Sequence, residues 1–202
     1  MAARAAKLDS VCLYCGSSDA ADPAFITDAQ ALGAMIAGAG LRLIYGGGGV
    51  GLMGACARAA HEGGGRVLGV IPDFLRGRER PLNDVETVVV HSMHERKMMM
   101  FDRSDAFVVL PGGIGTLEEV VELLSWRRLH LHEKPVVFYS PRGFWEPLFE
   151  LLHHTIRENL TPPEFADCWT SVERVEEVIP ALLAMAARSE ETAVEVVTTR
   201  IA

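Results

Sequence analysis

Apolar and polar residues form alternating blocks along this chain. Short apolar runs of strand length recur, and between them lie longer segments in which apolar residues follow helical spacing. The first helical segment has the usual boundary signals, with Asp22 before Pro23 at its start and Gly38 and Gly40 near its end. We therefore expect strands at residues 11–15, 41–45, 66–71, 85–90, 105–110 and 134–139, with a short one near 168–172.

This order of elements predicts the fold class. Strands that alternate with helices form βαβ units, which build a parallel sheet covered by helices on both faces. The near-continuous apolar strands agree with burial on both faces. We expect a single doubly wound, Rossmann-like α/β domain over residues 1–187 and a polar C-terminal tail over 188–202. Ligands of such sheets bind beyond the carboxyl ends of the strands.

Charge and composition exclude several classes of function. The chain has 202 residues and a net charge of −8, and it carries no basic stripe of the kind that binds nucleic acid. No apolar run approaches the ~20 residues of a membrane span, and the first residues lack the apolar core of a signal peptide. We expect a cytoplasmic protein with no membrane partner. The four cysteines do not suggest a disulfide framework.

The segment PGGIGT at 111–116 follows the fifth predicted strand. Its three glycines allow backbone N–H groups to converge, and a helix predicted to begin at Thr116 adds unpaired N–H groups and a dipole that favour an anion such as phosphate. Thr116 and Glu119 also have the spacing of a capping box. Glu119 therefore either caps the backbone or, with Glu118, faces an uncharged part of the ligand such as a sugar.

A second glycine-rich segment, GGGGVGLMG at 46–54, has the G-x-G-x-x-G spacing of a dinucleotide site at Gly49, Gly51 and Gly54. Asp73 follows where a ribose-binding acid would lie, so an NAD(P)-dependent oxidoreductase is one alternative. The segment follows the second strand, however, whereas the fingerprint usually follows the first. Glycines needed only for a tight turn are another explanation, and a non-catalytic nucleotide or cofactor carrier is a further alternative function.

The segment SMHERKMMM at 92–100 places Arg96 and Lys97 on the second turn of a helix after the fourth strand. We expect strands four and five to be neighbours, which would bring this basic pair close to the acids near PGGIGT. Ser92 and Glu95 form a second capping box. The methionines at 98–100 are expected to pack against the sheet. The histidines and acids show no metal-ligand pattern.

Taken together, these motifs resemble the LOG family, the cytokinin riboside 5′-monophosphate phosphoribohydrolases, once widely labelled lysine decarboxylases. The resemblance rests on the pattern P-G-G-x-G-T-x-x-E at 111–119, the Arg96–Lys97 pair, YGGGGVGLMGA at 45–55, CGSS at 15–18 and the segment at 125–139. It implies cleavage of the N-glycosidic bond of a purine riboside 5′-monophosphate, such as AMP or its N6-prenylated form. It also implies a homodimer or higher homo-oligomer that needs no metal or organic cofactor.

The resemblance also assigns residues to the site. It implies that Arg96 and Glu119 are catalytic, with Glu119 stabilising positive charge on the ribose and Arg96 keeping its own charge. Further substrate-binding residues implied by it, or expected in the glycine loops, are Ser17, Gly47, Gly48, Glu79, Lys97, Gly112, Gly113, Ile114, Gly115, Thr116, Leu117, Glu118 and Ser125.

Overall fold

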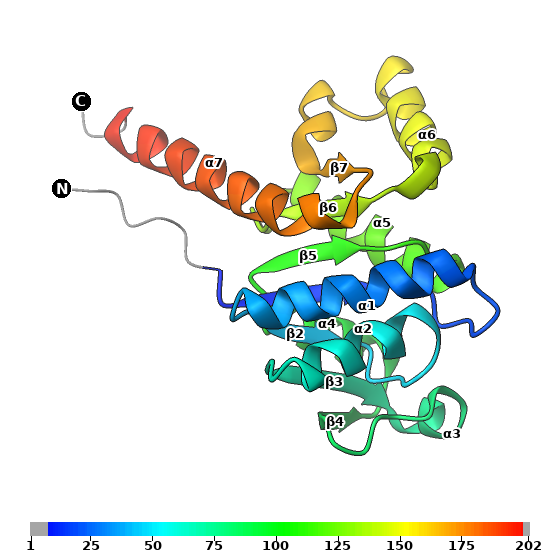
Figure 1. Ribbon diagram of the computed structural model, residues 1–202. Helices are drawn as coiled ribbons and strands as arrows, with labels where there is room; N and C mark the ends of the chain where they lie inside the picture. Colours follow the sequence, from blue (N-terminus) through cyan, green and yellow to red (C-terminus); the bar gives the residue numbers. More distant parts are fainter. Residues whose placement is uncertain (1–7, 200–202) are drawn as a thin grey trace.

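A single parallel sheet forms the centre of the computed structural model, which describes the backbone of residues 8–199 and the side chains of residues 8–189. Figure 1 shows the sheet with helices around it. Its strand order is β4-β3-β2-β1-β5-β6-β7, and every pair of neighbours is parallel. The strands are β1 (Ser10–Tyr14), β2 (Arg42–Tyr45), β3 (Val67–Pro72), β4 (Glu86–Val90), β5 (Ala106–Val109), β6 (Val136–Tyr139) and β7 (Thr170–Val172).

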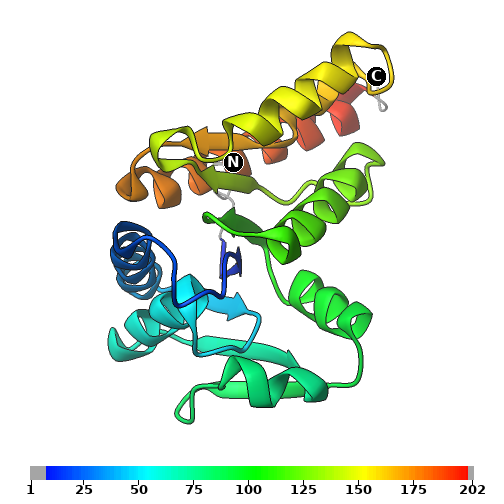
Figure 2. The same ribbon diagram turned by 90° about the vertical axis from the view of Figure 1, so that its right-hand side faces the viewer.

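Helices cover both faces of the sheet, as the predicted α/β fold requires. Buried side chains of α1, α2 and α7 pack on one face, and those of α4, α5 and α6 pack on the other. Figure 2 shows these two layers from the side. The helices are α1 (Pro23–Gly38), α2 (Gly51–Glu62), α3 (Arg76–Glu79), α4 (Met93–Asp102), α5 (Ile114–Arg128), α6 (Glu146–Arg157) and α7 (Val178–Thr199).

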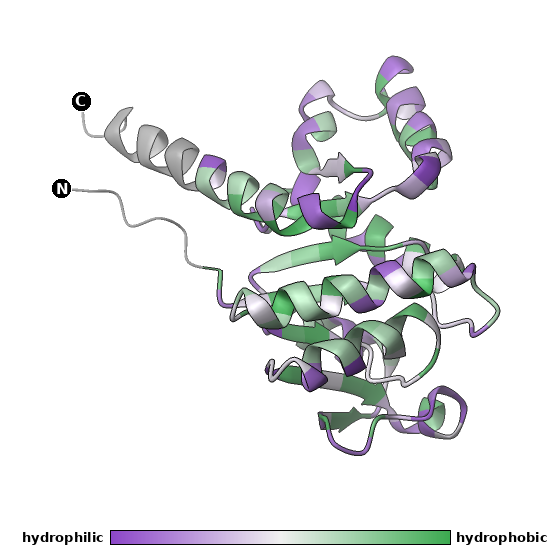
Figure 3. Cartoon of the chain, in the orientation of Figure 1, coloured by the Kyte–Doolittle hydropathy of each residue, from purple (hydrophilic) through white to green (hydrophobic). Residues whose placement is uncertain are grey.

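The core lies along the central strands. All residues of β1, β5 and β6 are buried, which explains why these strands read as continuous apolar runs. In Figure 3 the sheet is mostly hydrophobic, while hydrophilic residues gather on α6 and in the loops, for example around α3. Burial of this apolar surface is the main favourable term in folding, so the patterning of the sequence was sufficient to predict the layers.

The position of β4 corrects one expectation. β4 lies at the edge of the sheet, and β3, β2 and β1 separate it from β5. Strands four and five are therefore not neighbours. Helix α4 connects the edge strand β4 to β5, which lies on the other side of β1. Because α4 packs on the same face of the sheet as α5, this connection brings Arg96 and Lys97 close to α5.

Two further boundaries differ from the sequence prediction. The polar segment 72–84 contains a short 3₁₀ helix, η1 (Asp73–Leu75), followed directly by α3. Helix α7 continues past residue 188 to Thr199, where the sequence predicts a polar tail, and residues 200–202 of that tail lie outside the described part. In the described part of the chain, no helix has the length and apolarity needed to cross a lipid bilayer.

Candidate functional site

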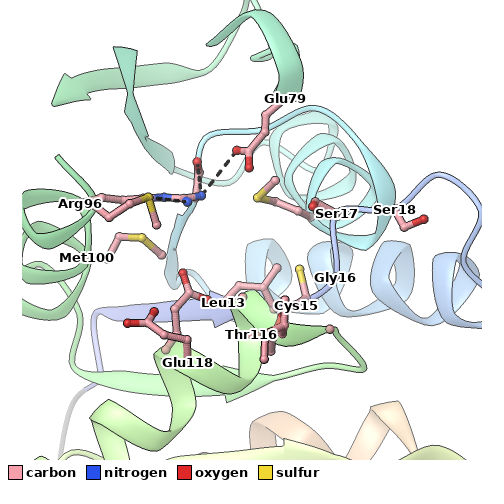
Figure 4. Close-up of a pocket in the computed structure, with 17 residues that line it drawn as sticks. Leu13, Cys15, Gly16, Ser17, Ser18, Glu79, Arg96, Met100, Thr116 and Glu118 are labelled. Carbon is pink, nitrogen blue, oxygen red and sulfur yellow. Dashed lines mark hydrogen bonds and ion pairs between the residues drawn. The ribbon is translucent and has the colours of Figure 1, made fainter. Parts of the chain in front are cut away.

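A cavity of about 350 Å³ opens at the carboxyl ends of the central strands. The strand order reverses at this point: β2, β3 and β4 follow on one side of β1, and β5, β6 and β7 follow on the other. The loops after β1 and β5 therefore diverge and leave a crevice between them. Figure 4 shows side chains from the β1 loop, from α3, from α4 and from the start of α5 converging on this space. The cavity is lined by Leu13, Cys15, Gly16, Ser17, Ser18, Gly46, Met53, Glu79, Met93, Arg96, Met100, Gly113, Ile114, Gly115, Thr116, Glu118 and Glu119.

The first turn of α5 forms one wall of the cavity. The first intrahelical bond runs from Leu117 N to Gly113 O at 3.0 Å, so the N–H groups of Ile114, Gly115 and Thr116 precede the ladder and have no partner within the helix. No side chain caps this end of the helix. The helix start therefore offers the cavity three amide donors and the positive end of the dipole, an arrangement suited to an anion.

The start of α5 also decides between the two roles of Glu119. The helix begins at Ile114, two residues before the predicted start at Thr116, and the residue that precedes it is Gly113. The predicted Thr116–Glu119 capping box is therefore wrong. Thr116 lies inside the first turn, and its hydroxyl packs so closely on Gly112 that a Cβ there would lie 2.2 Å from Thr116 Oγ1. Glu119 is thus free to line the cavity.

Glu119 is an acid in a poorly solvated position. Burial raises the pKa of its carboxyl group to about 7, against the opposing attraction of Arg96. Among the side chains of residues 8–189, none donates a hydrogen bond to this carboxylate, so both of its oxygens are available to a ligand. A carboxyl group that titrates near neutral pH inside a cavity is suited to exchange a proton or to stabilise a developing positive charge.

Arg96 is fixed across the cavity by backbone carbonyl groups. Its Nε donates to Val70 O at 3.2 Å, and its Nη2 donates to Gly46 O at 2.8 Å. The guanidinium fits only because residue 46 is glycine, since a Cβ at that position would lie 1.9 Å from Arg96 Nη2. The glycine-rich loop after β2 therefore makes room for the arginine.

Glu79 approaches Arg96 from α3. Its Oε2 lies 3.6 Å from Arg96 Nη2 and is buried, with no hydrogen-bond partner among the described residues. Burial raises the pKa of Glu79, and the positive charge of Arg96 opposes that rise. A buried acceptor without a donor is costly unless a ligand supplies one. The structure thus brings Glu79, Arg96 and Glu119 to one cavity, as Figure 4 shows for the first two.

Lys97 lies behind the cavity wall. Its Nζ pairs with Glu118 Oε1, and it also contacts Glu122 Oε2 at 2.8 Å, with the lysine side chain only 10% exposed. Lys97 does not line the cavity. It instead joins α4 to α5 and offsets the negative charge of Glu118 close to the amides of the helix start. This pairing reduces the electrostatic repulsion between Glu118 and a phosphate bound at the helix start.

The second glycine segment serves packing. Gly51 N donates to Asp19 Oδ1 at 2.9 Å and Met53 N contacts Gly16 O at 3.4 Å, so amides at the start of α2 are already bonded. A Cβ at Gly54 would lie 2.2 Å from the carbonyl carbon of Gly49, which leaves no room between the loop and the helix. This occupied helix start does not offer a pyrophosphate site, and Asp73 lies exposed on η1 outside the cavity.

The remaining predicted residues divide into two groups. The cavity lining includes Ser17 and the segment 113–116, but not Gly47, Gly48, Gly112, Leu117 or Ser125. Ser125 is exposed on α5, nearly two turns beyond Glu118.

Sequence reasoning also missed an apolar wall formed by Met53, Met93 and Met100. Met100 was expected only to pack against the sheet, and it both packs there and lines the cavity. Residues 93, 96 and 100 have a spacing that places Met93 and Met100 on the same helix face as Arg96. This spacing could have identified the two methionines of α4 as part of the cavity wall.

No metal centre is evident. Among the side chains of residues 8–189, no group of three histidine, cysteine, aspartate or glutamate residues could hold a metal ion. The four cysteines are free, and burial raises the pKa of Cys15, which lines the cavity, well above the usual range of a thiol.

Known proteins match this chain over most of its length. The family described as possible lysine decarboxylase matches residues 53–182. The chain is 42% identical to a probable cytokinin riboside 5′-monophosphate phosphoribohydrolase from Oryza sativa subsp. japonica, over 84% of this chain and 78% of that protein. It is 36% identical to a cytokinin riboside 5′-monophosphate phosphoribohydrolase from Arabidopsis thaliana, over 87% of this chain and 82% of that protein.

Solved structures share the fold. The molybdenum cofactor carrier protein from Chlamydomonas reinhardtii matches with a TM-score of 0.67 and 23% identity, over 89% of this chain and 99% of that chain. The molybdenum cofactor binding protein from Rippkaea orientalis matches with a TM-score of 0.63 and 24% identity, over 88% of this chain and 97% of that chain. At this identity the likeness concerns the fold alone.

Proposed function

Because the chain belongs to the LOG family of phosphoribohydrolases, we propose that it hydrolyses the N-glycosidic bond of a purine riboside 5′-monophosphate. AMP and its N6-prenylated, cytokinin form are the candidate substrates, and the products are the free base and ribose 5-phosphate. The observation that carries the proposal is that an open helix start lines the same cavity as Glu119, a carboxylate with no ion pair or hydrogen-bond donor among the described side chains.

In the proposed complex, the 5′-phosphate binds at the amides of residues 113–116 and the ribose lies above Glu119. Binding of the phosphate fixes the sugar relative to the acid, and orientation of this kind can supply a substantial part of the ~7–11 kcal/mol that proximity offers a reaction. The purine lies toward Arg96 and the methionine wall. Flexible thioether side chains adapt to flat, apolar groups of different size.

Bond cleavage then follows the usual course of glycoside hydrolysis. The bond between C1′ and the purine nitrogen breaks, its electron pair leaves with the base, and positive charge develops on the ribose. We propose that ionised Glu119 stabilises this charge and accepts a proton from the water that adds to C1′. Glu119 then releases this proton to solvent, and the departing base takes up one proton from solvent to give the neutral free base. Arg96 keeps its proton because its pKa exceeds ~12, so it acts on the leaving base through its charge and hydrogen bonds. Glu79 offers its free oxygen to a donor group of the substrate.

The products of hydrolysis provide the test of this function. Incubation with AMP and with its isopentenyl analogue, followed by chromatography, should show release of the base together with ribose 5-phosphate. Adenosine lacks the anion that the helix start binds, so its kcat/KM should be at least tenfold lower, which corresponds to about 1.4 kcal/mol of lost binding. Equal turnover of AMP and adenosine would contradict the phosphate cradle, and tight nucleotide binding without any product would favour a carrier.

We further propose that the protein is a homodimer that uses the outer face of α5. Ile114, Val121 and Leu129 are 84%, 48% and 56% exposed, and their spacing of seven and eight residues places them along one stripe of the helix.

The oligomeric state can be measured by sedimentation equilibrium. The parent protein should sediment as a dimer, and the variant Val121→Arg should sediment as a monomer because a charge cannot be buried unpaired in an apolar interface. A matched change on another helix, Leu151→Arg, alters a side chain that is 59% exposed on α6 and should leave the dimer intact. A monomeric parent, or a dimer that tolerates Val121→Arg, would contradict this interface.

A further inference from the structure

The segment at residues 73–84, here called the strap, lies beside the cavity entrance and supplies Glu79 to it. It contains η1 and α3 and leads into β4 at the edge of the sheet. Leu82 packs its side chain against the core, and the backbone of the strap accepts a bond from Gly49 N to Glu79 O at 2.7 Å. The contact between Glu79 and Arg96 depends on where the strap lies, because Glu79 belongs to a helix of only four residues.

A second contact holds the strap from outside the cavity. Arg80 follows α3 in a left-handed conformation, with φ of 44° and ψ of 72°, so the helix ends at Glu79. Arg80 Nη2 then pairs with Asp19 Oδ2 at 2.6 Å, while Glu79 reaches inward to Arg96. The adjacent residues Glu79 and Arg80 thus pair on opposite sides of the strap, Glu79 toward the cavity and Arg80 away from it.

Asp19 is itself firmly placed. Its other oxygen, Oδ1, accepts the N–H of Gly51 at 2.9 Å, and this bond, together with Arg80, lowers the pKa of the Asp19 carboxyl group. Gly51 has a φ of +56°, and a Cβ there would lie 2.6 Å from the carbonyl carbon of Ser17, so the partner of Asp19 is packed tightly on the β1 loop. Asp19 therefore connects the strap to the start of α2 and to the loop that lines the cavity.

We propose that the pair of Asp19 and Arg80 holds the strap over the cavity and makes Asp19 a positioning residue for Glu79. The proposal rests on the proposed function for its effect on turnover, but its effect on the strap does not. The pair is exposed, at 69% for Arg80 and 64% for Asp19, so salt should weaken it.

Asp19→Asn isolates this contact, because asparagine keeps one oxygen for Gly51 and loses the charge that faces Arg80. Trypsin cleavage after Arg76 and Arg78, followed by mass spectrometry, should be roughly fivefold faster than in the parent, because cleavage tracks the open population when reclosing is fast. Under the same conditions kcat/KM for AMP should fall roughly fivefold, the size of effect that an exposed pair gives. At about 1 M NaCl the two proteins should converge, since the Debye length falls to ~3 Å.

The matched control is Asp73→Asn. Asp73 pairs with Arg76 at 3.4 Å on the same strap and is similarly exposed, but it connects the strap only to itself. This variant should leave both cleavage and kcat/KM within twofold of the parent. Arg80→Lys, made in the parent, should keep both quantities close to the parent values, because an ammonium group can still pair with Asp19.

Several outcomes would overturn the proposal. Asp19→Asn could leave trypsin cleavage unchanged, Asp73→Asn could have an equal effect, or cleavage could accelerate while kcat/KM stays at the parent value. If the parent protein releases no base from AMP, the proposed function fails by itself, and the rate of trypsin cleavage still decides whether Asp19 holds the strap.

Discussion

Replacing Glu119 by glutamine should reduce the release of adenine from AMP by about a thousandfold, the middle of the range that a positioned general base supplies. Glutamine has nearly the same shape, so the cavity and the fold are retained, but it neither stabilises a cationic ribose nor accepts a proton from water. The measurement is kcat at saturating AMP, with product quantified by chromatography. A variant that retains the parent kcat would show that Glu119 is not catalytic.

The same variant should be more stable than the parent at alkaline pH. Burial raises the pKa of Glu119 from 4.5 to about 7 in the folded protein. Protonation is thus favoured by folding, so the contribution of Glu119 to stability is fully present below pH 4.5 and is lost as pH rises through about 7. The difference in pKa corresponds to at most about 3 kcal/mol, and some solvation of the half-buried carboxylate reduces it.

Glutamine does not ionise, so it avoids this loss. Urea unfolding should give a higher free energy of unfolding for Glu119→Gln than for the parent at pH 8 and little difference near pH 4.5, with the gain developing between those values. The parent's kcat should decline as pH falls below about 7, because the ionised form that the mechanism uses disappears. A difference in stability that does not depend on pH would contradict the buried, ionisable state of Glu119.

Gly46→Ala should lower kcat for AMP at least about a hundredfold, although residue 46 bears no reactive group. The added methyl carbon would lie 1.9 Å from Arg96 Nη2 and 3.0 Å from Met53 Sδ, so the guanidinium must leave its place. Arg96 then loses its bond to Gly46 O and its position beside Glu79. Removing one preorganised donor from a transition state typically costs ~2.7–4 kcal/mol, which sets the expected size.

The matched control for this change is Gly38→Ala. Gly38 ends α1, and a Cβ there would meet nothing within 4 Å, so this variant should keep the parent kcat and lose no stability. Circular dichroism should show that Gly46→Ala remains folded, since displacing one buried arginine costs a few kcal/mol against the ~5–15 kcal/mol of a typical domain. Activity of Gly46→Ala within threefold of the parent would contradict the role given to Arg96.

The sequence alone was sufficient to predict the layers of this fold. Apolar runs of strand length between helical segments specify buried parallel strands, because each helix must cover one face of the sheet. The Ser92 cap was also predictable, since its hydroxyl accepts Glu95 N at 3.1 Å, a bond between residues three apart. The glycine spacing in PGGIGT similarly indicated a helix start directly after β5, because the signal is local to one turn.

Sequence pattern did not predict which strands are neighbours. Periodicity is the same for a central strand and for an edge strand that a helix covers, so nothing local showed that β4 lies at the edge. The approach of Arg96 and Lys97 to the acids after PGGIGT was predicted through strand adjacency and is in fact produced by the crossing of α4.

The roles of individual charged residues depended most on tertiary structure. By itself the sequence determined an α/β domain with acidic residues and a pair of positively charged residues near a glycine-rich helix start. Only the folded structure decided that Glu119 lines the cavity instead of capping α5, that Lys97 is paired with acids behind the wall, and that Glu79 faces Arg96. The physical reason is that burial, pairing and the direction of a side chain arise from contacts between segments distant along the chain, whereas periodicity and capping arise from neighbours within a few residues.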